Sequence, residues 1–483
     1  MALGRQKRRQ AELMIGWAEL PRSPGHAFYD RLQAVLLEAG FDGFAEAQCK
    51  PYYAARHGRP SLPPGRYFRM HLVGYFEGIE SERGLEWRCA DSLSLREFLR
   101  LATTEPVPDH SWLSKTRSRL PLEVHEAAFS WVLQRLAEHG LIKGDRIGVD
   151  ASTIEANAAL RTIVRRDSGE SYRAMLERLA AESGIATPTA DDLVRLDRKR
   201  KGKRLSNAEW ASPSDPETKI AKLKDGRTHL AYKPEHAVDL DTAAIVAAEI
   251  HLADGGDTAT LPETLQAAEA NLAAVDAAPS AQDPAELVAD KGYHSRDGLK
   301  ELEDGAWKSR IAEKQVPGVS RWHGDEQARR AVYNNRARLR SGIAKEAFRL
   351  RVELVERSFA LTLDRGGMRR AWLRGRENLR KRYLVHVAGY NLGLIMRLLV
   401  GAGTPREFLA RVSAHLLLLT TADDAAAAIL VVVIGAEAAM LVVSVQPEPH
   451  DGSRVSSTRC YDRVLRESQS ITSLALRSGG NTG

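Results

Sequence analysis

The chain has 483 residues, more than one ordinary domain contains, so its length predicts two or three domains. Hydrophobic residues make up 43% and charged residues 28%, which is the composition of a soluble globular protein rather than a disordered one. The formal net charge of +7 favours a polyanionic partner such as nucleic acid.

Cysteine usage and the N-terminus indicate the compartment. Cys49, Cys89 and Cys460 are far apart and offer neither a disulfide framework nor a zinc spacing, so a reducing cytoplasm is expected. The basic start at residues 5–9 (RQKRR) is not followed by an apolar segment. We therefore interpret it as a polar tail or nucleic-acid arm, and not as a signal peptide.

Residues 26–140 are predicted to be mostly helical. Apolar residues recur there at helical spacing, in the stretches 28–36, 66–76, 93–101 and 124–136.

One helix in this region carries a basic face. Asp109 is a good N-cap, and the helix that follows it displays Lys115, Arg117 and Arg119. This pattern fits a DNA-contacting helix in a helix-turn-helix-like bundle, and it fits a solvated surface helix equally well.

From residue 141 the pattern changes to short strands that alternate with helices, which predicts a mixed α/β sheet. The expected strands are residues 146–150, two within 230–250, 286–290 and 307–311, and the expected helices are 261–277, 344–363 and 384–399.

Residues 161–227 interrupt this sheet pattern and are interpreted as an insertion with one helix, at 172–181, and a long basic loop. A basic run of this kind is often only solvated, but in a chain of this charge we expect it to contact phosphates. Its candidate DNA-binding residues are Arg198, Lys199, Arg200, Lys201, Lys203 and Arg204.

A second basic cluster occupies residues 365–382. Its candidate DNA-binding residues are Arg369, Arg370, Arg374 and Arg376. The amphipathic helix at 384–399 is expected to close the α/β core behind this cluster.

The tail differs from the rest of the chain. Residues 425–445 are almost wholly apolar and long enough to span a bilayer. Because the preceding chain is basic and not membrane-like, a buried helical or strand segment, or a poorly folding appendage, is the favoured interpretation. Residues 453–483 are expected to be disordered.

Two acidic residues end short apolar strands, Asp150 after Ile-Gly-Val and Asp290 after Leu-Val-Ala. A carboxylate at the end of a buried strand is costly unless it is paired or binds a cation. Together with a later acidic helix, the pair predicts a divalent-metal site built from oxygen ligands. Asp254 and Asp257 are interpreted as structural turn residues.

The third acid is ambiguous from spacing. In residues 349–359, Val352, Val355 and Phe359 are predicted to form an apolar stripe with Glu356 at its edge. Glu353 lies one turn earlier and could also point inward, or both could belong to a solvated Glu–Arg surface.

Such a site suits phosphodiester chemistry, which needs positive charge more than a covalent intermediate. Two divalent ions held by three carboxylates can activate the attacking water or 3′-hydroxyl and stabilise the leaving oxygen. The flanking arginines and lysines would then hold the DNA strand.

Several motifs together resemble the DDE-type transposases of bacterial insertion sequences, which have an RNase H-like core. The resemblance covers roughly residues 26–410. Its motifs are 74–78 (GYFEG), 81–83 (SER), 91–95 (DSLSL), 150–158 (DASTIEANA), 164–172 (VRRDSGESY), 224–230 (KDGRTHL), 235–239 (EHAVD), 289–295 (ADKGYHS), 354–359 (LVERSF), 367–370 (GMRR), 374–376 (RGR) and 391–394 (NLGL).

The resemblance implies a fold and a set of site residues. It implies an all-α, helix-turn-helix-like domain at 1–140, an RNase H-like catalytic domain at 141–410 and an unmatched tail at 411–483. By motif, Asp150 and Asp290 are the first two catalytic and metal-binding acids, and Glu356 is the third in preference to Glu353.

It also implies Mg²⁺ or Mn²⁺ (two ions), double-stranded DNA with terminal inverted repeats and a target site, and a homo-oligomer on DNA, with no membrane partner. DNA cleavage and strand transfer is the expected activity. A metal nuclease that only hydrolyses and an inactive DNA-binding remnant remain as alternatives.

Overall fold

The computed structural model describes residue 5, residues 24–412 and two strands at 429–434 and 439–444, with gaps at 57, 59, 103, 201–204, 224–225, 315–321 and 323. Contacts divide the chain into two units, Met1–Ala414 and His415–Gly483. The helical and strand-rich regions belong to the first unit, and the boundary near residue 140 stays a prediction.

The first part of the chain is helical, as its apolar spacing predicts. Side-chain caps start several of the helices: Ser81 accepts from the backbone NH of Gly84, and Asp109 from the NH groups of Ser111 and Trp112. The helices are α1 (Pro24–Glu38), α2 (Phe41–Cys49), η2 (Lys50–Tyr52), α3 (Pro64–Glu77), α4 (Glu82–Ala90), α5 (Leu93–Phe98), α6 (His110–Arg119) and α7 (Leu122–Glu138).

A seven-stranded mixed sheet follows, which confirms the predicted fold class. The long strand β6 pairs on one edge with β1 and β2 and on the other with β7 and β5, all antiparallel, and β1, β8 and β9 are parallel neighbours. The strands are β1 (Arg146–Ala151), β2 (Ile154–Glu155), β5 (Lys219–Lys222), β6 (Thr228–Asp239), β7 (Ile245–Leu252), β8 (Ala285–Ala289) and β9 (Trp307–Ile311).

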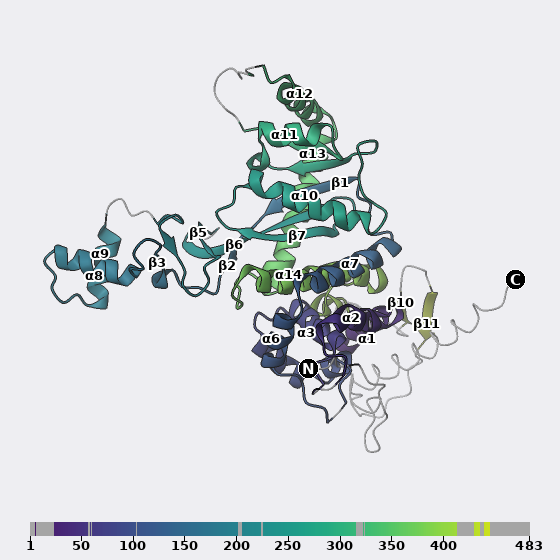
Figure 1. The fold of residues 1–483 in the computed structure, drawn as a ribbon. Coiled ribbons are helices and arrows are strands. Elements are labelled where there is room, and N and C mark those ends of the chain that lie inside the picture. Colours follow the sequence, from purple (N-terminus) through teal and green to yellow (C-terminus); the bar gives the residue numbers. More distant parts are fainter. Residues whose placement is uncertain are drawn as a thin grey trace. The chain divides into compact units, whose positions relative to one another are not determined.

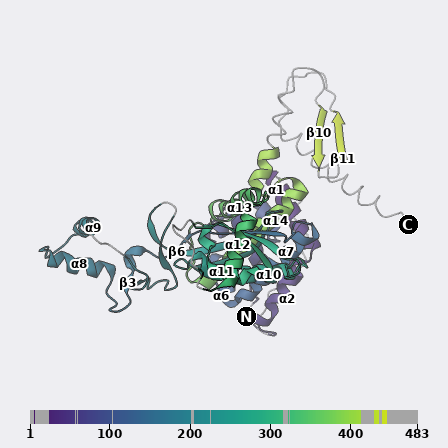
Figure 2. The same cartoon turned by 90° about the horizontal axis from the view of Figure 1, so that it is seen from above.

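Helices cover both faces of the sheet (Figures 1 and 2). Successive side chains of a strand point to opposite faces. Glu235 of β6 contacts α10 (Asp257–Ala273), whereas the next residue, His236, contacts α13 (Ala344–Phe359) and α14 (Arg376–Val400). The other elements of this part are η4 (Lys291–Tyr293), α11 (Arg296–Glu303), α12 (Glu326–Arg340) and the π-helical turn η5 (Ala360–Arg365).

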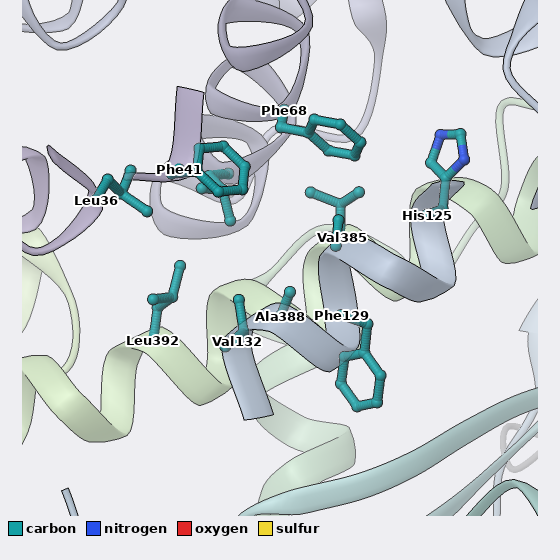
Figure 3. Close-up of a pocket in the computed structure, with 11 residues that line it drawn as sticks. Leu36, Phe41, Phe68, His125, Phe129, Val132, Val385, Ala388 and Leu392 are labelled. Carbon is teal, nitrogen blue, oxygen red and sulfur yellow. The ribbon is translucent and has the colours of Figure 1, made fainter. Parts of the chain in front are cut away.

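Helix α14 joins the sheet to the helical region, since it contacts β7, α3 and α7. Figure 3 shows Val385, Ala388 and Leu392 of α14 facing Phe68 and Val132. The space between them measures about 10 Å³, at the lower limit for one water molecule, so this contact is a packed core and not a ligand site.

The insertion contains more structure than its sequence predicted. It holds η3 (Leu160–Thr162), α8 (Tyr172–Glu182), α9 (Ala190–Lys199) and the paired strands β3 (Val164–Arg165) and β4 (Trp210–Ala211). The prediction of one helix and a basic loop was wrong for 190–199, where Thr189 and Asp192 form a capping box that starts a second helix.

Two observations concern apolar segments. The stretch Arg376–Val412, which includes α14, is long and apolar enough to cross a membrane, but 72% of its most apolar window is buried inside the protein.

In the second unit, β10 (Ile429–Ile434) and β11 (Ala439–Ser444) pair antiparallel, so the apolar tail contains strands. The disorder expected for residues 453–483, the arm at 6–9 and Cys460 lie outside the described residues.

Candidate active site

The two aspartates predicted from the sequence lie at the same edge of the sheet. Strands β1 and β8 are parallel, and Val149 pairs with Ala289, so Asp150 and Asp290 follow the last paired residues side by side. Neighbouring strands are about 4.8 Å apart. Two aspartates separated by 140 positions in the sequence thereby follow the ends of adjacent strands.

A buried arginine compensates the charge of Asp150. Nη2 of Arg351 lies 3.0 Å from Oδ1 of Asp150, and Nε and Nη2 of Arg351 each donate to the carbonyl oxygen of Val149 at 3.2 Å. The Arg351 side chain is only 8% exposed. Arg351 therefore connects helix α13 to the end of β1 at Asp150.

Asp290 is held by its own turn. Its Oδ1 accepts from the backbone NH of Gly292 at 2.7 Å and caps η4. A Cβ atom at Gly292 would lie 2.2 Å from Oδ2 of Asp257 and 2.9 Å from Oδ1 of Asp290. A larger residue there would require one of these carboxylates to shift, so Asp257 borders the turn that carries Asp290, which its interpretation as a turn residue did not foresee.

Glu356 borders the same cavity as Asp150. This open cavity measures about 430 Å³, and its lining also includes Glu353, Arg357 and Arg369. Asp290 is not part of that lining. Within the ranges described above, no three Asp, Glu, His or Cys side chains are close enough together to hold a metal ion.

The structure distinguishes Glu356 from Glu353. Glu353 forms ion pairs with Arg349 (3.2 Å) and Arg357 (2.5 Å) of its own helix. The Glu356 side chain forms no ion pair or hydrogen bond with any residue that the structure describes. Its carboxylate is therefore the better placed of the two to bind a cation.

The predicted apolar stripe on α13 was partly wrong. Val355 and Phe359 are buried, but the side chain of Val352 is 46% exposed and lines the cavity. Arg351 takes the inward position instead, because it pairs with Asp150 and the Val149 carbonyl. A charged residue in the buried face is not visible in a hydrophobic pattern.

His236 connects the elements behind the acids. It is paired with Asp150 across β6 and β1, and its Nδ1 lies 2.8 Å from Oγ of Ser358. Its ring stacks on Phe359 at 4.1 Å, and its Nε2 lies 2.6 Å from the Tyr383 hydroxyl. Burial lowers the pKa of His236 to about 3, so the ring is neutral and serves packing.

Sequence reasoning missed Arg351, His236 and the buried Glu235 as parts of this region. One signal in the sequence could have identified them: each is a polar residue at a position where the strand or helix pattern predicts a buried apolar one. The motif at 235–239 contains two of these positions, but the resemblance gave them no role.

The basic helix α6 is only partly a surface feature. Lys115 is exposed and Arg119 is half-buried, with its guanidinium 5.0 Å from the Tyr53 ring. Arg117 was predicted on the DNA-binding face, but it is buried and forms an ion pair with Glu82. Arg117 points inward because its ion-pair partner, Glu82, lies on the neighbouring helix α4.

The insertion presents part of its basic run to solvent. Arg198 and Lys199 at the end of α9 are exposed, whereas Arg200 donates to the Tyr172 hydroxyl at 3.2 Å. Lys201, Lys203 and Arg204 lie outside the described residues.

One member of the second basic cluster reaches the cavity. Arg369 pairs with Asp364 at 2.7 Å and donates to Oγ of Ser152 at 3.1 Å, just beyond Asp150. Arg370 and Arg374 are exposed, and Arg376 lies at the start of α14. The Arg369 guanidinium is thus held on the same cavity as Asp150 and Glu356. A guanidinium fixed in this way is suited to bind a DNA phosphate.

Two family models match the chain: the Transposase domain (DUF772) over residues 20–119 and the Transposase DDE domain over residues 193–431. The chain belongs to the DDE transposases of insertion sequences. Asp290 and Glu356 lie within the matched DDE domain, whereas Asp150 lies between the two matched ranges. No curated protein and no solved structure gives a significant match to this transposase.

Family membership carries some general properties. A transposase binds DNA, and DDE transposases generally use divalent metal ions.

Proposed function

We propose that this transposase cuts and joins DNA at the ends of an insertion sequence, with two Mg²⁺ or Mn²⁺ ions held by Asp150, Asp290 and Glu356. The observation that carries the proposal is the register of β1 and β8, which sets Asp150 beside Asp290, with Glu356 on the cavity that Asp150 borders. Carboxylate oxygens are the ligands that Mg²⁺ prefers.

The positions and charges of these residues support the proposal. Two carboxylates sit at adjacent strand ends, and the Glu356 carboxylate has no partner among the described residues. When bound, the ions would activate the attacking hydroxyl and stabilise the leaving oxygen. Arg351 orients Asp150, and Arg369 faces the same cavity, where it would bind the phosphate of the strand that is cut.

The partners follow from this chemistry. We propose that the exposed residues Lys115, Arg198, Lys199, Arg370 and Arg374 bind DNA phosphates of the terminal inverted repeats or the target. A homo-oligomer would bring two ends together, because joining both ends of an element needs two active sites.

Two substitutions test the acids. Asp150→Asn or Asp290→Asn should abolish nicking of DNA that carries the element ends, with binding of the same DNA nearly unchanged, because a neutral amide is a poor ligand for a hard cation. Near-normal nicking by either variant would contradict the assignment.

A second assay separates the alternatives. A pre-cleaved element end mixed with target DNA should give a joined product in the presence of Mg²⁺. Nicking without joining would indicate a nuclease that only hydrolyses. DNA binding with neither reaction would indicate an inactive remnant.

A further inference from the structure

A buried polar cluster lies directly behind the turn that carries Asp290. At its centre is Glu235 of β6, whose side chain is fully buried. Three hydroxyl groups donate to its carboxylate: Tyr293 at 2.8 Å and Thr260 at 2.9 Å to Oε1, and Thr264 at 2.5 Å to Oε2. Every oxygen of this buried acid is therefore paired.

The cluster keeps Glu235 ionised. Burial alone would raise the pKa of Glu235, but the nearby His251, the hydrogen bonds from Thr264 and Tyr293, and the nearby Lys233 hold this pKa below its ordinary value. Nζ of Lys233 lies 3.7 Å from Oε1 of Glu235. A buried charge that needs this many partners is costly compared with an apolar core, so stability alone does not account for the cluster.

The cluster lies against both strand ends that carry the aspartates. Glu235 is paired with Ala151, the residue after Asp150, and Tyr293 is the last residue of η4, the turn that Asp290 caps. Tyr293 is 2% exposed, so its hydroxyl reaches Glu235 from a fixed direction. Among the three hydroxyl donors, only Tyr293 belongs to the turn beside Asp290.

A second connection runs from the cluster to the other side of that turn. Nζ of Lys233 lies 2.7 Å from Oδ1 of Asp257 and donates to Oγ1 of Thr260 at 2.9 Å. Asp257 borders Gly292, the middle residue of η4. The turn is therefore held between Tyr293 on Glu235 and Asp257 on Lys233.

We propose that Glu235 is a positioning residue for metal binding: by accepting the Tyr293 hydrogen bond it fixes η4 and so the direction of the Asp290 carboxylate. The inference rests on the proposed function, in which Asp290 binds a metal ion. Metal ligands must be placed within a few tenths of an ångström, and loss of a group that orients a ligand typically costs about 10- to 100-fold in metal affinity.

The test compares two variants that each remove one hydroxyl from Glu235. Tyr293→Phe acts at the turn of Asp290, and Thr264→Val, the matched control, acts on α10. Mn²⁺ binding to the full chain without DNA is measured by electron paramagnetic resonance, and thermal unfolding is measured alongside. We expect Tyr293→Phe to weaken Mn²⁺ binding about tenfold or more and Thr264→Val to weaken it less than about threefold, at similar loss of thermal stability.

The outcomes separate this inference from the function on which it rests. Wild-type protein that binds no Mn²⁺ would overturn the proposed metal site itself. Wild-type binding with equal losses in the two variants would overturn only the positioning role. If Tyr293→Phe does not fold, Glu235→Gln replaces it: the amide oxygen still accepts from Tyr293, so Mn²⁺ affinity should stay within about threefold of the wild type, and a loss of about tenfold or more at unchanged thermal stability would contradict the proposal.

Discussion

Single residues set the geometry of this site through very short distances. Gly292 is an example: its φ is ordinary, and the space favours glycine, because two carboxylates that would have to shift approach the position where a Cβ would stand. Arg351 is another, since one guanidinium binds both a backbone carbonyl and the Asp150 carboxylate. Neither requirement can be recognised from a residue's own neighbours in the sequence.

The first prediction concerns Gly292. Gly292→Ala should reduce nicking about tenfold or more, because the added methyl group displaces Asp257 or Asp290. Nicking rates and thermal unfolding of the purified variant measure the effect. Gly256→Ala is the control, since no atom lies within 4 Å of its added Cβ. Equal activities of the two variants would show that the turn has room to adjust.

The second prediction concerns the two glutamates of α13. Glu356→Gln should lower nicking by more than about 100-fold, as expected when a direct ligand is removed. Glu353→Gln should retain most activity, because Glu353 pairs with Arg349 and Arg357 instead. Metal-dependent nicking of the same DNA by both proteins decides between them, and the reverse order would move the third ligand to Glu353.

At the scale of elements, the sequence predicted individual strands and helices better than it predicted which of them lie next to each other. It located β1 and β8 with their aspartates, because local hydrophobic patterns end at those residues, and it located α13, where the motif resemblance and not the spacing selected Glu356. It did not show that β1 and β8 are adjacent, since parallel pairing joins segments 140 residues apart. Arg117 was misplaced for the same reason: its partner Glu82 lies on another helix.

The third prediction belongs to helix α9. Replacing Arg198 and Lys199 by alanine should weaken binding to DNA of any sequence, because both side chains are exposed and basic. The slope of log K against log salt should fall by about 0.9 for each phosphate that the variant no longer neutralises. Arg173→Ala on α8 is the control, since Arg173 is exposed but pairs with Glu177. An unchanged slope in the double variant would show that the end of α9 does not contact DNA phosphates.

At the scale of the whole molecule, the acids, the basic surfaces and the apolar core all belong to the unit Met1–Ala414. The fourth prediction follows: a chain ending at Ala414 should be at least as soluble as the full chain and should keep metal-dependent nicking. Sedimentation after expression and the nicking assay test this. An insoluble truncated chain would show that β10 and β11 complete the fold of the first unit.

Helix α14 has a consequence for how such proteins diversify. It packs on the sheet through β7 and on the helical region through α3 and α7, within one continuous apolar core. A helical region that shares its interior with the sheet is not expected to be exchanged between relatives as a separate domain. The surfaces proposed above to bind DNA, on α6 and the insertion, can therefore change by substitution alone, whereas we expect the residues that face α14 from both sides to change together.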